Sequence, residues 1–182
     1  MALTSLLVLV GCSGSEQEQA DTDQWSTADD TFVAQMIPHH HLGMTLIDEA
    51  TRRSGDVRLR HLVFEMNSYH MSDLEVLEGW ASDRSIAHAS EFPGDLPASD
   101  VESLSDYEGV SHDIVWLDLM IRHHSGALTI ADAELAGGTV PEAIDLATET
   151  RRVQAAEIDT MRALLGELCA ENQDAAVMGR CP

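Results

Sequence analysis

The chain has 182 residues, with 32 acidic residues against 10 basic ones and a formal net charge of −22. This length allows one domain with a substantial hydrophobic core. The strong negative charge argues against a nucleic-acid partner, because phosphate binding needs a basic surface. Beyond the N-terminal segment, no apolar stretch approaches the roughly 20 residues that a membrane-spanning helix needs.

The N-terminal segment resembles a bacterial lipoprotein signal. An apolar run, Leu6–Val10, is followed by Gly11 and Cys12 and then by a polar, acidic stretch. The basic residues that usually precede such a run are missing. We expect residues 1–12 to form the signal, Cys12 to be lipidated, and residues 13–28 to form a flexible acidic linker. The protein would then be exported and anchored to the outer face of the cytoplasmic membrane through lipid alone. The alternative is a short apolar N-terminus with a free cysteine.

Export would place the two remaining cysteines, Cys169 and Cys181, in an oxidising compartment. Both follow the last helical pattern, and eleven residues lie between them. This spacing allows a disulfide that closes the C-terminal tail, residues 169–182. Two free thiols or a soft-metal site are the alternatives.

Apolar residues recur at helical spacing in four segments, which predicts an all-α chain. The first two segments cover residues 32–50 and 57–80, the third ends at Gly137, and the fourth covers residues 140–168. Ser26 to Asp30 provides cap residues before the first segment. Thr139 to Glu142 has the spacing of a capping box before the fourth.

The connection between the second and third segments is long, rich in Asp, Ser, Gly and Pro, and covers residues 81–111. It is too long for a turn but long enough to run the length of a bundle. Two helix hairpins joined by one long crossover have the connectivity of a ferritin-like four-helix bundle. We expect this bundle over residues 29–168, with one repeat at 30–80 and the other at 112–168.

The two hairpins carry the same motif. Met36–His40 returns as Met120–His124, and 84 residues separate each matching pair. The same offset matches His70 with Gln154 and Asp73 with Glu157. A fixed offset over this length indicates an internal duplication.

A helical projection at about 100° per residue shows which polar side chains face the core. His40 and His124 lie in the middle of their apolar arcs, whereas His39 and His123 lie at the edges. The apolar arcs of the second and fourth segments also contain polar residues, namely His70, Asp73, Gln154 and Glu157. Three further histidines lack such a context and are expected on the surface: His61, His88 and His112.

Polar groups buried without partners cost about 1–3 kcal/mol each. The polar residues that face the core must therefore bond to one another, bind water or bind an ion. Histidines and carboxylates beside methionines favour a metal site. They favour copper over zinc, because methionine thioethers bind reduced copper but are not ligands that zinc prefers. The chain has no Glu-x-x-His sequence, which disfavours a ferritin-type di-iron enzyme.

The paired motifs also resemble domain-of-unknown-function family 305. Its signature is Met-Ile-x-His-His followed by a second helix with Gln-x-x-Glu-Ile-x-x-Met, and Gln154–Met161 matches this second part. The resemblance covers about residues 32–165. It implies a ferritin-like bundle that is often exported, with some copper-binding members associated with copper tolerance. The family methionine seven residues after the first motif histidine is replaced here by Leu46 and Ile130.

We therefore interpret the chain as an exported metal-binding lipoprotein that buffers, transports or confers tolerance to copper without catalytic turnover. The expected ligands are His40, His124 and His70. The residues expected to complete or orient this set are Met36, Met120, Asp73 and Glu157. His39 and His123 are expected at outer, exchangeable positions. The alternatives are a structural or interaction module with a hydrogen-bonded polar core and, last, a redox enzyme. A homo-oligomer and an unidentified protein partner both stay open.

Overall fold

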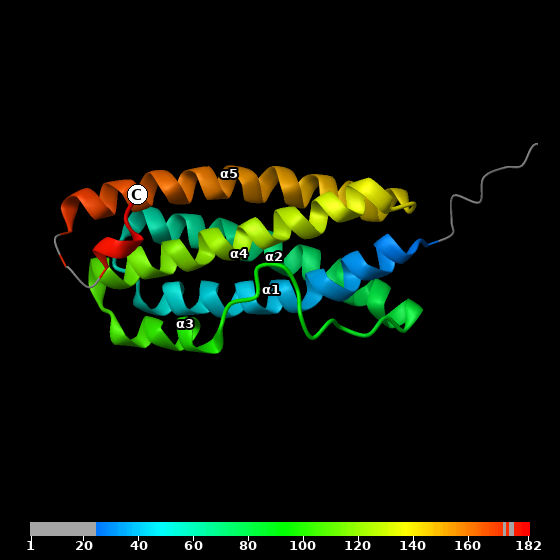
Figure 1. Ribbon diagram of the computed structural model, residues 1–182, viewed down its shortest axis with the longest axis horizontal. Helices are drawn as coiled ribbons and strands as arrows, with labels where there is room; N and C mark the ends of the chain where they lie inside the picture. Colours follow the sequence, from blue (N-terminus) through cyan, green and yellow to red (C-terminus); the bar gives the residue numbers. More distant parts are fainter. Residues whose placement is uncertain (1–24, 173, 175–176) are drawn as a thin grey trace, which may run out of the picture.

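The computed structural model describes residues 25–172, 174 and 177–182 (Figure 1). Its four long helices are α1 (Thr27–Arg53), α2 (Val57–Arg84), α4 (Gly109–Gly137) and α5 (Pro141–Glu171). The shorter elements are α3 (Ala98–Glu102) and two 3₁₀ turns, η1 (Ser103–Asp106) and η2 (Met178–Arg180). The predicted all-α bundle of two hairpins is confirmed. The signal, Cys12 and most of the linker lie outside the described residues. Within the described part, no helix is long and apolar enough to cross a membrane.

The N-terminal ends of α1 and α5 share one cap. Ser26 caps α1, and its hydroxyl oxygen accepts from the backbone of Asp29, whose carboxylate accepts from the backbone of Ser26. The same carboxylate accepts from the backbone N–H groups of Thr139 and Val140 at the start of α5. The predicted capping box at Thr139 is therefore wrong. Val140 is the N-cap, and its hydrocarbon side chain cannot accept a cap bond, so Asp29 of α1 accepts from this helix end instead.

Glu134 is buried beside this shared cap. Burial, reinforced by the neighbouring Asp29 carboxylate, raises the pKa of Glu134 to about 8. Burial alone would also raise the pKa of Asp29, but hydrogen bonds from Ser26 and Val140 outweigh it and lower that pKa. Glu134 is thus neutral at pH 7, and its protonated carboxyl group shares a hydrogen bond with the Asp29 carboxylate, which contributes to the raised pKa.

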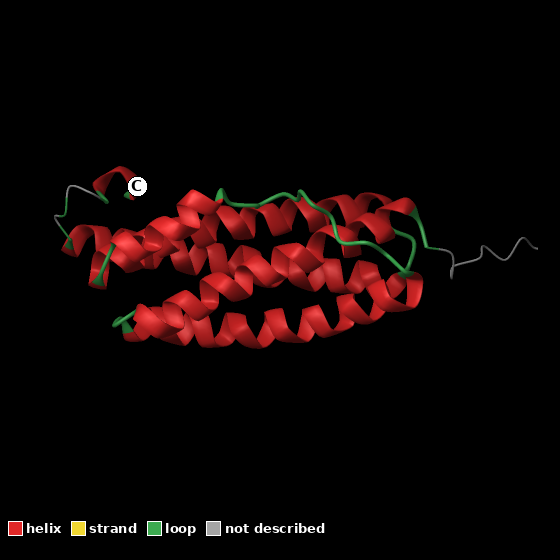
Figure 2. Cartoon of the chain, turned by 90° about the horizontal axis from the view of Figure 1, so that it is seen from below, coloured by secondary structure: helices red, strands yellow, loops and turns green. Residues whose placement is uncertain are grey.

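The crossover between α2 and α4 is shorter and more ordered than predicted, because α2 extends to Arg84 and the segment contains α3 and η1. It runs along the bundle, as Figure 2 shows. Pro38 explains one of its anchors. A proline lacks the N–H that would bond the carbonyl four residues earlier, which here belongs to Ala34. The backbone N–H of Ala89 in the crossover donates to that free carbonyl at 2.8 Å. Pro38, which is unfavourable inside a helix, thus leaves an acceptor for the crossover.

The hydrophobic core is divided into two clusters. One lies toward the α1–α2 turn and includes Leu46, Trp116 and Met161. The other lies toward the shared cap and includes Phe32 and Met36. The histidines predicted to face the core lie between these two clusters along α1, α2 and α4.

The tail folds back on the bundle through the Cys169–Cys181 disulfide, with Cα atoms 5.8 Å apart. Val177 is buried in the first core cluster, and Arg180 bonds Asp118 of α4 at 2.6 Å. The disulfide therefore pins a short segment against the end of the bundle.

A buried cluster of five histidines as the candidate metal site

Five histidines from three helices meet in the layer between the two core clusters. α1 provides His39 and His40, α2 provides His70, and α4 provides His123 and His124. All five are at most 2% exposed. The rings of His39 and His123 stack with centroids 3.8 Å apart, and the ring of His70 lies 4.8 Å from that of His40 and 5.8 Å from that of His124. We call this set the histidine cluster.

Each imidazole of the cluster donates one N–H to a fixed acceptor. His39 Nε2 donates to the carbonyl of His123, and His123 Nδ1 donates to the carbonyl of Gly94. The Nδ1 atoms of His40 and His70 donate to the carbonyls four residues earlier, each belonging to a methionine. All four of these bonds measure 3.0 Å. Since a carbonyl can only accept, each bond fixes which ring nitrogen carries the proton.

The second nitrogen of each ring has no hydrogen-bond partner. Burial, reinforced by neighbouring imidazoles, lowers the pKa of His39 and His70 well below the usual value and that of His123 to about 3. These three rings are therefore neutral at physiological pH. A neutral imidazole held by its N–H, with the other nitrogen bare, is the arrangement found in protein metal ligands.

Gly43 of α1 makes the space in which two of these bare nitrogens lie. A Cβ atom at this position would be 2.7 Å from His70 Nε2 and 3.1 Å from His123 Nε2. An alanine would therefore clash with His70. The second copy has Ala127 at the matching position and Gln154 in place of the histidine. The glycine and the histidine of the first copy thus fit each other.

Two carboxylates contact the cluster from its outer side. Glu157 of α5 accepts from His124 Nε2 at 2.9 Å, and Asp73 of α2 lies 3.6 Å from His40 Nε2. Both carboxylates are partly exposed, whereas their histidine partners are fully buried.

The expected outer position of His39 and His123 is also wrong. Both side chains are fully buried, because the crossover covers them. Phe92 packs edge-on against His39 with centroids 5.8 Å apart, and Gly94 holds His123 through its carbonyl. Gly94 has φ +81°, and a Cβ there would be 2.5 Å from the carbonyl oxygen of His123. Only a glycine allows this close approach. Helical periodicity gave no signal for this contact.

Met36 and Met120 are both fully buried, but they belong to different core clusters on either side of the histidines. Among the described residues, no three His, Cys, Asp or Glu side chains are already grouped to hold a metal ion. The bare ring nitrogens are chemically suited to a metal, but in this structure they are not grouped around one point.

Four histidines lie outside the cluster, and one of them, His41, is exposed with its Nε2 3.2 Å from a carboxylate oxygen of Glu78. His61 and His88 are exposed as predicted, with their Nε2 atoms near carboxylates. The prediction for His112 is wrong, because it is fully buried and its Nδ1 bonds Asp113, which also accepts from Ser54 Oγ at 3.0 Å. This group joins the start of α4 to the α1–α2 turn.

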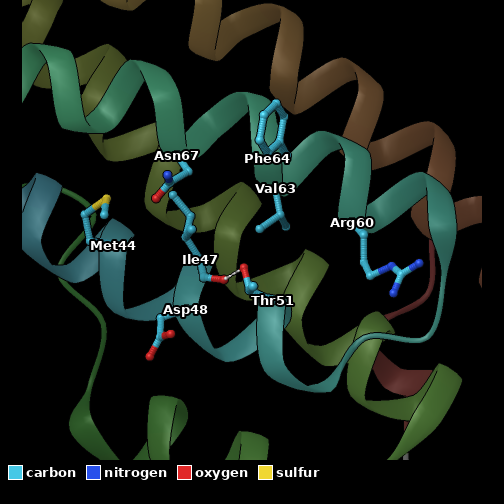
Figure 3. Close-up of a pocket in the computed structure, with 8 residues that line it drawn as sticks. All are labelled: Met44, Ile47, Asp48, Thr51, Arg60, Val63, Phe64 and Asn67. Carbon is cyan, nitrogen blue, oxygen red and sulfur yellow. Dashed lines mark hydrogen bonds between the residues drawn. The ribbon is translucent and has the colours of Figure 1, made fainter.

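A larger groove on the surface does not belong to the cluster. It has a volume of about 490 Å³ and lies between α1 and α2, nearer their turn (Figure 3). Its lining is mostly apolar, with Phe64 exposed at its edge, and the hydroxyl of Thr51 is already bonded to the carbonyl of Ile47. It presents no histidine.

Comparison with known proteins places the chain in a family. The profile described as "Domain of unknown function (DUF305)" matches residues 29–165, the whole bundle up to the last turns of α5. The chain belongs to the DUF305 family. No curated protein matches it.

Three solved structures of similar proteins share the fold. A DUF305 fragment from Deinococcus radiodurans is 24% identical, with a TM-score of 0.71 over 79% of this chain and 98% of its own. A DUF305 protein from Streptomyces coelicolor that is inferred to be secreted is 23% identical, with a TM-score of 0.69 over 79% and 93%. CopM in the Cu(I)-bound form is 21% identical, with a TM-score of 0.66 over 78% and 96%. At these identities the likeness shows the shared fold alone.

Proposed function

We propose that this DUF305 protein binds copper ions in its histidine cluster and acts outside the cytoplasm as a copper buffer or carrier. It performs no catalytic turnover. Copper is its cargo, and it is held by residues of both hairpins. The ligands are drawn from the histidine cluster, while Glu157 orients His124 through the hydrogen bond from its Nε2 and Asp73 lies 3.6 Å from the bare Nε2 of His40.

One observation carries this proposal. Five buried imidazoles each donate one N–H and each leave the other nitrogen without a partner. Buried polar atoms without partners cost about 1–3 kcal/mol each, and proteins rarely keep several of them in one place without a use. The five free nitrogens can be satisfied only by a species that accepts their lone pairs, which is a metal ion or a hydrogen-bond donor such as water.

Copper suits this donor set better than other metals. Imidazole nitrogens bind copper, zinc, iron and nickel, and thioether sulfurs select reduced copper. Buried methionines flank the cluster on both sides, at Met36 and Met120. The copper-bound neighbour CopM, which shares the fold, supports the same choice. Zinc is the second candidate, since it needs no sulfur.

The location outside the cytoplasm rests on separate features. Gly11-Cys12 ends a short apolar run of the kind that precedes lipidation, and Cys12 would then carry the only membrane attachment. The Cys169–Cys181 disulfide fits an oxidising compartment. A fold relative inferred to be secreted agrees with export.

A structural polar layer is the second candidate function. It is favoured by the absence of a grouped three-ligand site among the described residues. In that case, ordered water would satisfy the bare nitrogens, and the layer would fix the register of the four helices.

The deciding experiment is calorimetric titration of the purified protein with Cu(II), and with Cu(I) in the presence of a reductant that spares the disulfide. We expect near-stoichiometric binding that is abolished by the double variant His40→Ala/His124→Ala. The matched control is His61→Ala/His88→Ala, which also removes two imidazoles but from the surface. His70→Gln, which places the residue of the second copy, should weaken binding with little loss of stability.

The outcomes separate the two functions. Copper binding that survives in the control but not in the cluster variant supports a copper carrier. Absence of binding in the wild type, together with a loss of stability in the cluster variant, supports the structural layer instead. Equal loss in both double variants would indicate surface association and overturn the proposal.

A further inference from the structure

The histidine cluster is closed toward three of the four seams between neighbouring helices. Within the two hairpins α4 packs on α5 and α1 packs on α2, where the groove of Figure 3 lies nearer the turn and is lined by no cluster histidine. The α1–α4 seam lies under the crossover, which is bonded to the carbonyl of Ala34 on α1 and packs through Gly94 on Gly126 of α4. α2 and α5 make the sparsest contact of these neighbouring helices. A cation that reaches the cluster therefore meets the least obstruction between α2 and α5.

A small pocket lies in this α2–α5 seam directly outside the cluster. Its lining comes from these two helices alone and includes His70 and Asp73 of α2 and Thr150, Gln154 and Glu157 of α5. Its volume is about 20 Å³. This is room for about one water molecule or one ion of similar size. His70 belongs to both the pocket and the cluster, so the pocket leads directly to a candidate ligand.

Three polar atoms on residues lining this pocket have no hydrogen-bond partner: His70 Nε2, Thr150 Oγ1 and Gln154 Oε1. The three residues are at most 3% exposed. His70 Nε2, which faces Gly43 of α1, and Gln154 Oε1 can only accept, and the Thr150 hydroxyl can accept as well as donate, so the three suit a cation or a water molecule. Two of them are oxygens, placed on the helix opposite His70.

The two carboxylates of the pocket connect solvent with the deeper histidines. The side chains of Asp73 and Glu157 are 21% and 10% exposed, and each lies beside a histidine of 0% exposure. They belong to opposite walls of the seam. Two negative charges at a narrow opening attract a cation and can replace its water ligands.

We propose that the α2–α5 seam is the route by which copper ions reach and leave the histidine cluster, with Asp73 and Glu157 receiving the ion from solvent. This proposal rests on the copper-binding function proposed above. The ion exchanges water for carboxylate oxygens at the opening. Thr150 and Gln154 then provide neutral oxygen ligands on its way to His70.

The test compares the rates of copper uptake and release. Stopped-flow mixing with Cu(II) measures uptake in the wild type and in Asp73→Asn/Glu157→Gln. The matched control is Glu75→Gln/Asp159→Asn, which removes one charge from each of the same helices at exposed positions. We expect the association rate to fall tenfold or more in the seam variant and less than twofold in the control. The control variant should keep the stoichiometry of the wild type. A third variant, Phe92→Ala, opens the crossover side and should leave the rate unchanged.

Failure of the route is distinguishable from failure of copper binding. A wild type that binds no copper overturns the proposed function. Normal stoichiometry with equal association rates in the seam and control variants overturns the route alone. The same holds if the seam variant changes only the dissociation rate, because the carboxylates would then be ligands rather than an access point. Faster uptake in Phe92→Ala would place the route under the crossover instead.

Discussion

Substitution of Gly43 by alanine tests how tightly the histidine cluster is packed. The new Cβ would lie 2.7 Å from His70 Nε2, against an ordinary contact distance of 3.4 Å or more, so a neighbour must move by about 0.7 Å. Overpacking of this kind costs about 1–3 kcal/mol. Against this, alanine is about 1 kcal/mol better than glycine inside a helix. We expect Gly43→Ala to lower the free energy of unfolding by up to about 2 kcal/mol.

A double-mutant cycle with His70→Gln isolates the clash, because it recreates the pairing of Ala127 with Gln154 found in the second copy. In the His70→Gln background, Gly43→Ala should stabilise by about 1 kcal/mol, which gives a coupling energy of about 1–3 kcal/mol. Denaturant unfolding of the metal-free protein measures all four corners. Gly79→Ala on α2 is the control, since its Cβ meets nothing within 4 Å and should simply stabilise. A coupling energy below about 0.5 kcal/mol would refute the proposed fit between Gly43 and His70.

Three further predictions concern stability and pH. The pKa of Glu134 is about 8 in the fold and near 4.5 in the unfolded chain. The stability that protonation of Glu134 gives the fold is therefore fully present below pH 4.5 and is lost as the pH rises to 8. Glu134→Gln should therefore remove this decline and raise the unfolding free energy at pH 7 by up to about 3 kcal/mol; parallel pH profiles of variant and wild type would contradict this. Conversely, three imidazoles have lowered pKa values and are neutral in the fold, but they take up protons in the unfolded chain below pH 6.5. The free energy of unfolding should therefore fall by about 4 kcal/mol for each pH unit below 6.5. The imidazoles are His39, His70 and His123, so His70→Gln should reduce that slope by about a third in unfolding measured from pH 6.5 to 5. Cys169→Ser/Cys181→Ser should cost about 2–3 kcal/mol by opening a 12-residue loop, with copper stoichiometry unchanged, since the disulfide lies at the end of the bundle.

The sequence predicts those features of the fold that depend on periodicity within one helix. Apolar spacing and terminal glycines place four helices, and the repeated Met-Ile-x-His-His motif indicates that the two hairpins are equivalent. The same spacing predicts that His40, His70 and His124 face the core, and all three are buried there. This succeeds because side-chain direction along a single helix follows from 100° per residue.

Contacts between elements are not contained in that periodicity. His39 and His123 lie at the edges of their arcs, and only the crossover decides that they are buried. His112 shows the same limit, because its burial depends on the α1–α2 turn that provides Ser54. A helical projection of one segment cannot show what covers its edge.

Two residues did carry a signal that could have been used. Pro38 inside a helix implies a free carbonyl at Ala34, and a polar crossover is the nearest unpaired source of donors. Gly43 replaces the alanine of the second copy where His70 replaces glutamine. The two copies thus differ at two positions, where one side chain is smaller and the other larger in the first copy. Such compensating changes in volume indicate that the two residues are in contact.

The stacked pair of His39 and His123 has a consequence for how such a protein can diverge. These residues occupy the same position in the two copies, and contact between equivalent residues occurs on a twofold axis. In a homodimer of single hairpins, the two rings would be the same residue of two identical chains, so every substitution would occur on both sides. Joining the hairpins in one chain frees each side to change alone. The pairing of Gly43 with His70 on one side, and of Ala127 with Gln154 on the other, is a difference that no symmetric dimer could encode.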